Sequence, residues 1–340
     1  MRARPNYDLV ERIVLRCIAA GNASTFNQIL RNAPVNDRTL RVCLEKLIQS
    51  DQIYKIGDKF VSRAERNARN IVPSCECPTC EGRSIVANPE ISAKFTQFVE
   101  IARRAPPFIQ DYNQRPVTFD TAWHRALFAL QPNKIPPKRV ILLGDDDLTS
   151  IPFAMLLPDS EVIVLEADKR IVDFLNIVSE ELSHDGFSAI EYDARKKVDD
   201  RYLGTADLAV CDPSSTLFEL FISRCIDLSA KDGAGNILTF VHPTYFVQDI
   251  GLQKLFSDMN LVIRAMIPAF NRYKLHDNDI CSNQDIVPIN SSDKETIAFV
   301  ESLVMLGVCE DSKPVIVGDL DLNYEELYGE TATRRFDKLK

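Results

Sequence analysis

The stretch from Arg139 to Ser150, RVILLGDDDLTS, constrains the fold of this chain more than any other. Its apolar run stops at Gly144 and is followed by three aspartates, which is typical of a buried strand that ends in a ligand-facing loop. Ligands of open α/β sheets lie at the carboxyl ends of the strands. Clustered carboxylates raise one another's pKa unless a cation lies among them. A site for a positively charged ligand is therefore predicted at Asp145, Asp146 and Asp147.

A helix N-terminus is the structural alternative for these aspartates. Aspartate is favoured at the cap and in the first turn of a helix, and Thr149 or Ser150 could add to such a cap. One or two aspartates would fit this alternative. A third aspartate directly after a glycine favours the cation site.

Charge divides the chain into two parts. Residues 1–70 contain 13 Lys/Arg against 7 Asp/Glu, whereas the remaining 270 residues contain 27 against 42. The acidic part disfavours nucleic acid as a substrate and favours cations such as polyamines. No apolar run approaches the roughly 20 residues that span a bilayer, and the N-terminus has no signal-peptide core, so we expect a cytoplasmic location.

The basic part, residues 1–70, is predicted to be a small winged-helix-like domain. Apolar stripes predict helices over residues 6–20, 24–30 and 36–48, followed by a hairpin over residues 53–61. Such a unit could bind DNA through Arg38 and Arg41 of its third helix. The alternative is a docking or dimerisation module attached to an enzyme, and we expect a homodimer.

A connector over residues 71–92 contains Cys75, Cys77 and Cys80 in SCECPTCEG. Thiolates at this spacing resemble half of a zinc knuckle and could hold a structural zinc ion. A fourth ligand would have to come from Cys43, Cys281 or a partner chain. Linker thiols without metal are the alternative, because an unexported chain with nine cysteines favours reduced thiols.

Further apolar runs after the aspartate loop predict a doubly wound α/β sheet with strands that end in acidic residues. A carboxylate at the end of the second strand can accept hydrogen bonds from both ribose hydroxyls, which makes Glu166 the first candidate for that role, ahead of Asp168. Further strands are predicted over residues 188–192, 206–211, 236–241 and 261–267. A last strand and an acidic tail are predicted within residues 313–330.

GDDDLTS after an apolar strand resembles the signature of the branched-chain polyamine synthases, the aminopropyltransferases typified by N4-bis(aminopropyl)spermidine synthase. This resemblance implies a Rossmann-like fold similar to that of AdoMet methyltransferases, over residues 93–340, behind a winged-helix-like domain. It also implies transfer of an aminopropyl group from decarboxylated AdoMet to a polyamine such as spermidine. Methylthioadenosine would be the second product.

The resemblance continues in the segment before the first strand, DYNQRPVTFDTAWHRALFAL. Tyr112 and Gln114 stand where the family lines the entrance to its site, and both could orient an amine by hydrogen bonding. Thr118 and Asp120 stand in this segment too, and Asp120 could pair with the amine, although each could instead cap the following helix. His124 on that helix needs no catalytic role.

Three later segments also resemble the family. Asp193 in YDARK would reach the adenine amino group, although a turn residue is the alternative. Asp212 opens the counterpart of the family's Asp-Pro-Pro segment and would accept a hydrogen bond from a protonated amine. Asn271 and Tyr273 would wall the acceptor pocket.

Two departures from the family pattern bear on the acceptor. Ser214 replaces the second proline, and Cys225 stands where a glycine is expected. His242 could be a pocket residue, but a loop histidine is the simpler interpretation. Glutamates of the tail could cover a cationic substrate, with a solvated tail as the alternative: Glu325, Glu326 and Glu330.

A mechanism follows from these placements. Polyamine nitrogens are mostly protonated near neutral pH, so a carboxylate must take a proton before the amine attacks, and Asp147 or Asp146 is the expected base. Asp212 and Asp145 would hold flanking ammonium groups. Four residues would bind the donor: Gly144, Asp145, Glu166 at the ribose and Asp193 at the adenine. Two alternatives stay open: an AdoMet-dependent methyltransferase, and a DNA-binding regulator with a polyamine-sensing domain.

Overall fold

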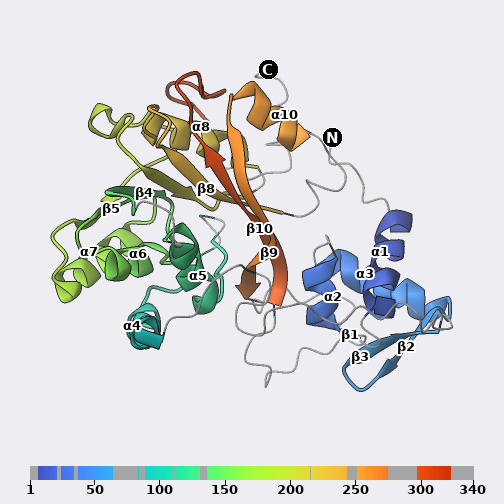
Figure 1. Ribbon diagram of the computed structural model, residues 1–340. Helices are drawn as coiled ribbons and strands as arrows, with labels where there is room; N and C mark the ends of the chain where they lie inside the picture. The colour runs from blue at the N-terminus through green and yellow to red at the C-terminus, as the bar shows by residue number, and fades with distance from the viewer. Residues whose placement is uncertain are drawn as a thin grey trace.

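The computed structural model describes most of the chain, in segments: residues 7–20, 24–33, 37–63, 83, 89–109, 112, 114–130, 136–214, 216–242, 251–274 and 297–322. A small N-terminal unit, blue in Figure 1, lies beside a larger unit built around a seven-stranded sheet. None of the helices in the described residues is both long and apolar enough to cross a membrane.

The N-terminal unit contains three helices and a three-stranded antiparallel sheet of order β1-β3-β2. In chain order its elements are α1 (Tyr7–Ala20), β1 (Ser24–Thr25), α2 (Phe26–Asn32), α3 (Asp37–Gln49), β2 (Ile53–Ile56) and β3 (Lys59–Ser62). The predicted helices and hairpin are present, but α2 begins two residues later than predicted. Thr25 and Gln28 form a reciprocal capping box that sets this start, and β1 is a strand that the sequence pattern did not reveal.

Arg41, which we expected on a DNA-contacting surface, is a packing residue of this unit. Its side chain is 2% exposed, and its guanidinium lies over the ring of Phe26, 4.7 Å from the centroid. An Arg in this position cannot reach a phosphate without unpacking. The side chain of Arg38 lies outside the described residues.

The two units pack against each other through the edge of the large sheet. Val300 of β10 (Ile297–Gly307) belongs to the apolar core of the N-terminal unit, and Ala269 of β9 (Val262–Lys274) packs against that core. Figure 1 shows α2 beside the lower ends of these two long strands. The elements that carry the site therefore also support the N-terminal unit.

The large sheet has the order β6-β5-β4-β7-β8-β10-β9. Its other strands are β4 (Arg139–Leu143), β5 (Glu161–Glu166), β6 (Phe187–Glu191), β7 (Leu208–Cys211) and β8 (Asn236–Val241). The first five strands in this order pair in parallel, and β10 and β9 add antiparallel pairs at one edge. The predicted α/β sheet is confirmed. Its strand order reverses between β4 and β7, where ligands of open α/β sheets bind.

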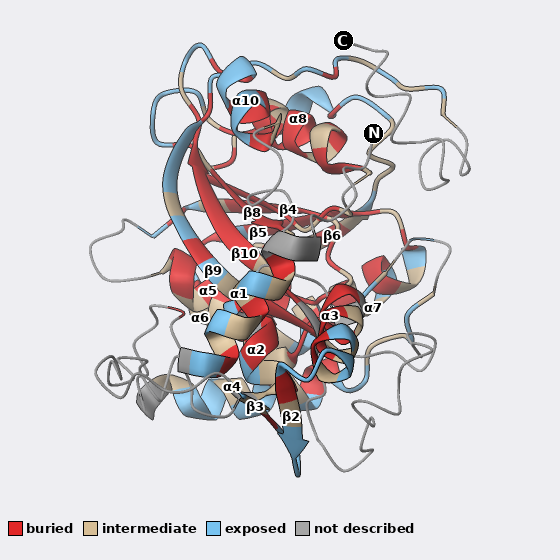
Figure 2. Cartoon of the chain, turned by 90° about the vertical axis from the view of Figure 1, so that its right-hand side faces the viewer, coloured by how far each residue is buried: buried red, intermediate tan, exposed pale blue. Residues whose placement is uncertain are grey.

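Helices cover both faces of this sheet (Figure 2). They are α4 (Pro89–Ala102), α5 (Phe119–Ala129), α6 (Ser150–Leu156), α7 (Lys169–Leu182), α8 (Phe218–Leu228) and α10 (Gly251–Asp258). Side chains alternate along β4, so Val140 and Leu142 join the core under α4 to α7, whereas Ile141 and Leu143 join the core under α8 and α10. This double burial explains the continuous apolar run before Gly144.

The last strands differ from the prediction. β9 continues through Lys274, so Asn271 and Tyr273 lie within a strand and not in a loop after it. Among the described residues the last strand is β10, and residues 313–322 contain no strand. Instead, Ile316, Leu320 and Leu322 pack on α8, and Arg224 of that helix donates a hydrogen bond to the carbonyl of Gly318 at 2.6 Å. Side-chain packing on a helix has taken the place of strand pairing here.

Candidate active site

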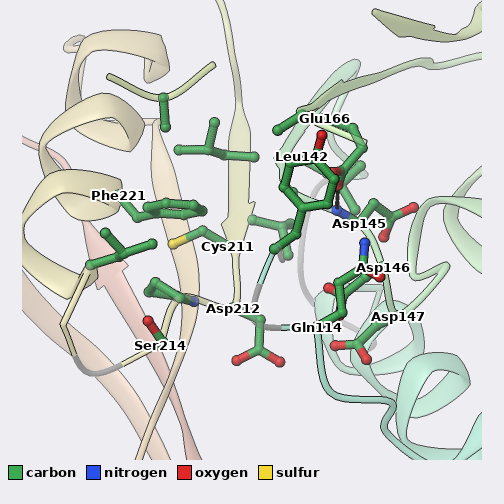
Figure 3. Close-up of a pocket in the computed structure, with 18 of the residues that line it drawn as sticks. Gln114, Leu142, Asp145, Asp146, Asp147, Glu166, Cys211, Asp212, Ser214 and Phe221 are labelled. Atoms are coloured by element: carbon green, nitrogen blue, oxygen red, sulfur yellow. Dashed lines mark hydrogen bonds between the residues drawn. The ribbon is translucent and has the colours of Figure 1, made fainter. Parts of the chain in front are cut away.

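A cavity of about 330 Å³ lies at the carboxyl ends of β4 and β7, at the point where the strand order reverses. Figure 3 shows Glu166 at the top of this cavity and the carboxyl groups of Asp147 and Asp212 at the bottom. Phe221 of α8 and Cys211 close the side opposite Leu142. The cavity therefore has one end with apolar walls and one end that is strongly acidic.

Glu166 organises the upper end by holding two backbone segments. Its Oε2 accepts a hydrogen bond from the Asp145 N–H at 2.7 Å, and its Oε1 accepts one from the Asp168 N–H at 2.8 Å. Gly144, between β4 and the aspartates, has φ +75°, a conformation that favours glycine. A carboxylate oxygen can accept more than one hydrogen bond, so Glu166 lines the cavity with acceptor capacity left for a hydroxyl.

Asp145 behaves differently from the other two members of the triplet. Both of its carboxyl oxygens lie 3.2 Å from the backbone N–H of Ser150, the first residue of α6, and the residue is only 3% exposed. The helix-terminus alternative therefore describes Asp145, although it also lines the cavity. Asp145 therefore acts as a helix cap, and its expected role as a holder of an ammonium group stays a prediction.

Asp146 and Asp147 face the lower end of the cavity. Asp147 Oδ1 accepts a hydrogen bond from the Val117 N–H at 2.9 Å, and Oδ2 accepts one from Arg125 at 2.8 Å. Burial raises the pKa of Asp147 to about 7 even though Arg125 acts to lower it. Asp146 accepts one hydrogen bond, from the Arg115 N–H, and burial together with the Asp147 charge raises its pKa well above the usual range.

Arg125 is the cation that the sequence interpretation missed. It lies on the buried face of α5, is 1% exposed, and its guanidinium lies 4.0 Å from the centroid of the Phe240 ring. Nη1 donates to Asp147, Nη2 donates to Asp212, and Nε donates to Asn271 Oδ1. One guanidinium thus joins the loop after β4 to the loop after β7.

Asp212 continues the network toward β9 and β10. The Tyr273 hydroxyl lies 2.8 and 2.7 Å from the two Asp212 oxygens and 2.8 Å from Glu301 Oε2. Asn271 is fully buried behind these groups and lies outside the residues that line the cavity. It supports Arg125 and Tyr273, whereas we expected it to wall a pocket. Glu301 was not identified from the sequence at all.

The entrance residues Tyr112 and Gln114 both line the cavity. Tyr112 is 41% exposed at the rim. The Gln114 amide donates to Asp168 Oδ2 at 3.0 Å and accepts from the Ile109 N–H at 2.9 Å, so its two polar groups position protein segments. Gln114 therefore connects the entrance to the cap of α7.

Thr118 and Asp120 both have structural roles: Thr118 caps a helix, and Asp120 forms ion pairs within the protein. The Thr118 side chain caps α5 by accepting a hydrogen bond from the Thr121 N–H. Asp120 pairs with Arg83 at 2.6 Å and with His124 at 3.2 Å, and it does not line the cavity. Pairing of Asp120 with a substrate amine was therefore a wrong expectation.

Two further residues line the cavity at opposite ends. Asp193 accepts hydrogen bonds from the backbone and side chain of Arg195, so a turn-forming role is established for it. His242 follows β8 and belongs to the cavity wall. From the sequence, a loop histidine was the preferred interpretation and a pocket residue was the alternative. Burial lowers the pKa of His242 to about 4, so its imidazole is neutral at physiological pH.

Carboxyl groups outnumber cations in the cavity wall. Among the residues that the structure describes, seven carboxyl groups and three guanidinium groups line it: those of Asp145, Asp146, Asp147, Glu166, Asp193, Asp212 and Glu301, with Arg115, Arg125 and Arg195. Burial raises the pKa of several of these acids above the ordinary value. The charge of a bound polycation would act in the opposite direction and lower the pKa of these acids.

Several sequence expectations lie outside the described residues. These are the cysteines proposed for zinc, Cys75, Cys77 and Cys80, and the tail glutamates Glu325, Glu326 and Glu330. Within the part of the chain that is described, no group of three or more His, Cys, Asp or Glu side chains could hold a metal ion.

Comparisons with known proteins agree with this geometry. A family model described as "Branched-chain polyamine synthase A C-terminal domain" matches residues 93–332. The N(4)-bis(aminopropyl)spermidine synthase of Methanocaldococcus jannaschii is 30% identical over 235 residues, which are 68% of this chain and 66% of the relative. The enzyme of the same name from Thermococcus kodakarensis is 26% identical over 206 residues, 58% of this chain and 57% of the relative.

A similar fold is found among solved structures. The branched-chain polyamine synthase of Thermus thermophilus, crystallised with N4-aminopropylspermidine and 5'-methylthioadenosine, superposes with a TM-score of 0.73 at 20% identity. The match covers 92% of this chain and 91% of that chain. Because it extends over nearly all of both chains, the likeness includes the N-terminal unit as well as the large sheet.

Proposed function

The chain belongs to the branched-chain polyamine synthase family, and we infer that it is an aminopropyltransferase of polyamine synthesis. It transfers the aminopropyl group of decarboxylated AdoMet to an amine nitrogen of a polyamine such as spermidine and releases methylthioadenosine. The observation that carries this inference is the position of the acidic cavity, at the strand-order reversal where this fold binds nucleotides. Both substrates are cations, and the wall is acidic.

The upper end of the cavity suits the nucleoside of the donor. Glu166 has acceptor capacity for the ribose hydroxyls, and Asp193 at the end of β6 is the candidate for the adenine amino group. Leu217 and Phe221 supply apolar surface for the base. The glycine at position 144 lets the ribose approach the backbone, because any side chain there would point toward Phe221 and Glu166.

The lower end suits the reacting amines. Asp147 and Asp212 lie close enough to share a hydrogen bond, so the two carboxyls act as a pair. An acceptor ammonium gives one N–H proton to this pair, and its freed lone pair attacks the aminopropyl carbon next to the sulfonium. The new N–C bond forms as the C–S bond breaks, and the sulfur keeps the bonding electrons as methylthioadenosine. Asp147, whose pKa is about 7, is the base, and Asp146 holds an ammonium group.

The direct test is product analysis. Purified protein incubated with decarboxylated AdoMet and a panel of linear polyamines should yield methylthioadenosine in equal amount to a product that is one or two aminopropyl units heavier by mass spectrometry. Fragmentation then tells whether the new group is on an internal nitrogen. Absence of both products with every acceptor would contradict the proposed activity.

Donor choice gives a separate prediction. AdoMet carries a carboxylate that decarboxylated AdoMet lacks, and this carboxylate would lie beside the aspartate loop, where like charges cost several kcal/mol. Calorimetry should therefore show decarboxylated AdoMet binding about a hundredfold more tightly than AdoMet. The variant Asp146→Asn should narrow that difference, whereas Asp159→Asn on the exposed loop after α6 should not. Equal affinity for both donors, with methyl transfer, would favour the methyltransferase alternative.

Gly144→Ala tests the nucleoside end. At φ +75° an alanine is strained by about 1–2 kcal/mol, and its Cβ would lie 3.6 Å from Phe221 Cε1 and 3.9 Å from Glu166 Oε2. The variant should unfold at lower urea concentration and bind methylthioadenosine more weakly. Gly57→Ala is the matched control, because Gly57 also has positive φ and nothing lies within 4 Å of its added Cβ. The control should lose stability and keep full affinity.

Several finer features complete the proposal. The N-terminal unit is a winged-helix-like module, a reading supported by its order of helices and strands, and it serves as a docking or dimerisation module in a homodimer. The domain limits 1–70, 71–92 and 93–340, a cytoplasmic location and a structural zinc ion remain predictions of the sequence. DNA binding through this module loses one of its two expected contacts because Arg41 is buried.

A further inference from the structure

The hydroxyl of Tyr273 has more partners than it has protons. Its oxygen lies 2.7 Å from Asp212 Oδ2 and 2.8 Å from Glu301 Oε2, and Asn271 Nδ2 donates to it at 3.2 Å. A phenol has one proton to donate. Two ionised carboxylates at these distances would leave one of them facing a lone pair, so one carboxyl must be protonated and donate to the Tyr273 oxygen.

Charge identifies Glu301 as the protonated partner. Asp212 forms an ion pair with the buried guanidinium of Arg125, so a negative charge on this carboxyl has a buried cation as its partner. Among the described residues no Lys, Arg or His lies within ion-pair distance of Glu301, and Asp212 and Asp147 both repel a negative charge there. Burial raises the pKa of Glu301 well above its usual range, and neither the attraction of Arg125 nor the Tyr273 hydrogen bond offsets this. Tyr273 therefore donates to Asp212 and accepts from Glu301.

The four groups form a continuous chain from the proposed base toward solvent. Asp147 contacts Asp212, Asp212 contacts Tyr273, and Tyr273 contacts Glu301. Asp147 and Tyr273 are buried, whereas Glu301 is half-buried on β10 and lines the cavity. Each transfer from a protonated acceptor amine leaves one proton in this cavity.

We propose that Glu301 is the outlet through which that proton leaves, by exchange along Asp212, the Tyr273 hydroxyl and the Glu301 carboxyl. Glu301 gives its proton to water, and the Tyr273 proton moves to Glu301. Asp147 then passes the proton that it took from the amine to Asp212, and Asp212 passes it on to Tyr273. Every group returns to its starting state, and one proton has left per aminopropyl group transferred. This inference rests on the proposed aminopropyl transfer and adds a residue that neither the sequence nor the family pattern indicated.

Glu301→Gln separates proton exit from every other role of this side chain. The glutamine amide donates to Tyr273 as the protonated carboxyl does, so the resting hydrogen bonds are kept, but an amide cannot release and regain a proton. We expect kcat to fall about a hundredfold, with the KM for the polyamine and the affinity for methylthioadenosine unchanged. The solvent deuterium isotope effect on kcat should rise, and added imidazole should restore part of the rate. Glu310→Gln, the same change on an exposed residue just beyond β10, should match the wild type in all four measurements.

Three results would overturn the inference. An unchanged kcat in Glu301→Gln would exclude an outlet role. A raised KM with unchanged kcat would instead make Glu301 a binding group for a substrate ammonium. A lowered kcat with neither imidazole rescue nor a larger isotope effect would make its role structural. Tyr273→Phe interrupts the same chain of proton carriers one step earlier, and it serves as the test if Glu301→Gln does not fold. Full kcat in Tyr273→Phe would also contradict the outlet role of Glu301. Failure of the proposed function itself would appear separately, as a wild-type protein that makes no methylthioadenosine.

Discussion

Asp147→Asn is expected to lower kcat/KM for aminopropyl transfer by about 10²- to 10⁴-fold while the protein stays folded. Asparagine cannot accept the proton of the acceptor ammonium, so the amine remains protonated and cannot attack. Folding should survive because Arg125 keeps its contacts to Asp212 and Asn271. Turnover is measured as methylthioadenosine release, and folding is checked by circular dichroism and methylthioadenosine affinity.

Asp159→Asn serves as the control for this substitution, since Asp159 is exposed on the loop after α6 and should keep full activity. Near-normal turnover by Asp147→Asn would exclude Asp147 as the base. Asp146→Asn would then become the decisive variant, because Asp146 is the other carboxyl at the lower end of the cavity.

The same carboxyl gives a pH dependence with a definite sign. The base must be ionised, so kcat/KM of the wild type should fall as the pH drops through about 7. The free energy of unfolding depends on pH in the opposite direction, because the protonated form of Asp147 is the one that favours the folded state. The pKa of Asp147 in the folded protein is raised above its unfolded value of about 3.9. Asp147 therefore contributes fully to the free energy of unfolding below about pH 4, and this contribution is lost as the pH rises to 7. Asp147→Asn should remove this part of the pH dependence of unfolding.

Arg125→Met is expected to cause the largest loss of stability, about 3–5 kcal/mol, because it leaves the buried carboxyls of Asp147 and Asp212 without their cation. Methionine fills similar volume over the Phe240 ring, so the loss reports charge more than a cavity. The pKa of Asp147 should rise further without the guanidinium, and the activity that remains should require more alkaline pH. Chemical denaturation and a pH profile of kcat/KM measure the two effects.

Arg125→Lys is the companion variant. It keeps the positive charge but cannot donate to Asp147, Asp212 and Asn271 at the same time. It should recover most of the stability and a pH profile near that of the wild type, with lower kcat. If Arg125→Met unfolded at the same denaturant concentration as the wild type, Arg125 would not stabilise the carboxyl pair.

The aspartate triplet shows how far sequence reasoning could go. Its place after a buried strand was predicted correctly, because an apolar run stopped by glycine is a local signal. The different contacts of the three aspartates were not predicted. All three aspartates line the cavity, but only Asp145 also caps α6. Which carboxyl turns toward a helix depends on backbone angles in the loop, and three identical residues in a row carry no information about those angles.

Arg125 and Glu301 were missed for a different reason. Each lies in an apolar stretch, Arg125 among alanines on the inner face of α5 and Glu301 within the apolar run of β10. A single charge in such a run is itself a signal, since an ion is rarely buried without a partner. Its partner, however, lies 22 to 146 residues away for Arg125 and 28 residues away for Glu301. Only the folded sheet brings these residues together.

The edge of the sheet was the least predictable part of the fold. The segment at residues 313–322 is apolar enough to suggest a strand, but it packs on α8 instead. The last strand in the described part of the chain, β10, pairs with β9 along its length and with β8 over Ser302–Gly307. Apolar content alone does not distinguish a strand from a segment that packs on a helix, because both bury the same surface.

The guanidinium of Arg125 ties the loop after β4 to the loop after β7, and this has a consequence for substrate length. A longer or bulkier polyamine cannot be admitted by spreading these two loops apart, since that would break ion pairs to both Asp147 and Asp212. In this chain, room for a larger acceptor must therefore come from elsewhere along the wall. Ser214, where the family pattern has proline, and His242 are the positions at which this chain would adjust the size of its acceptor.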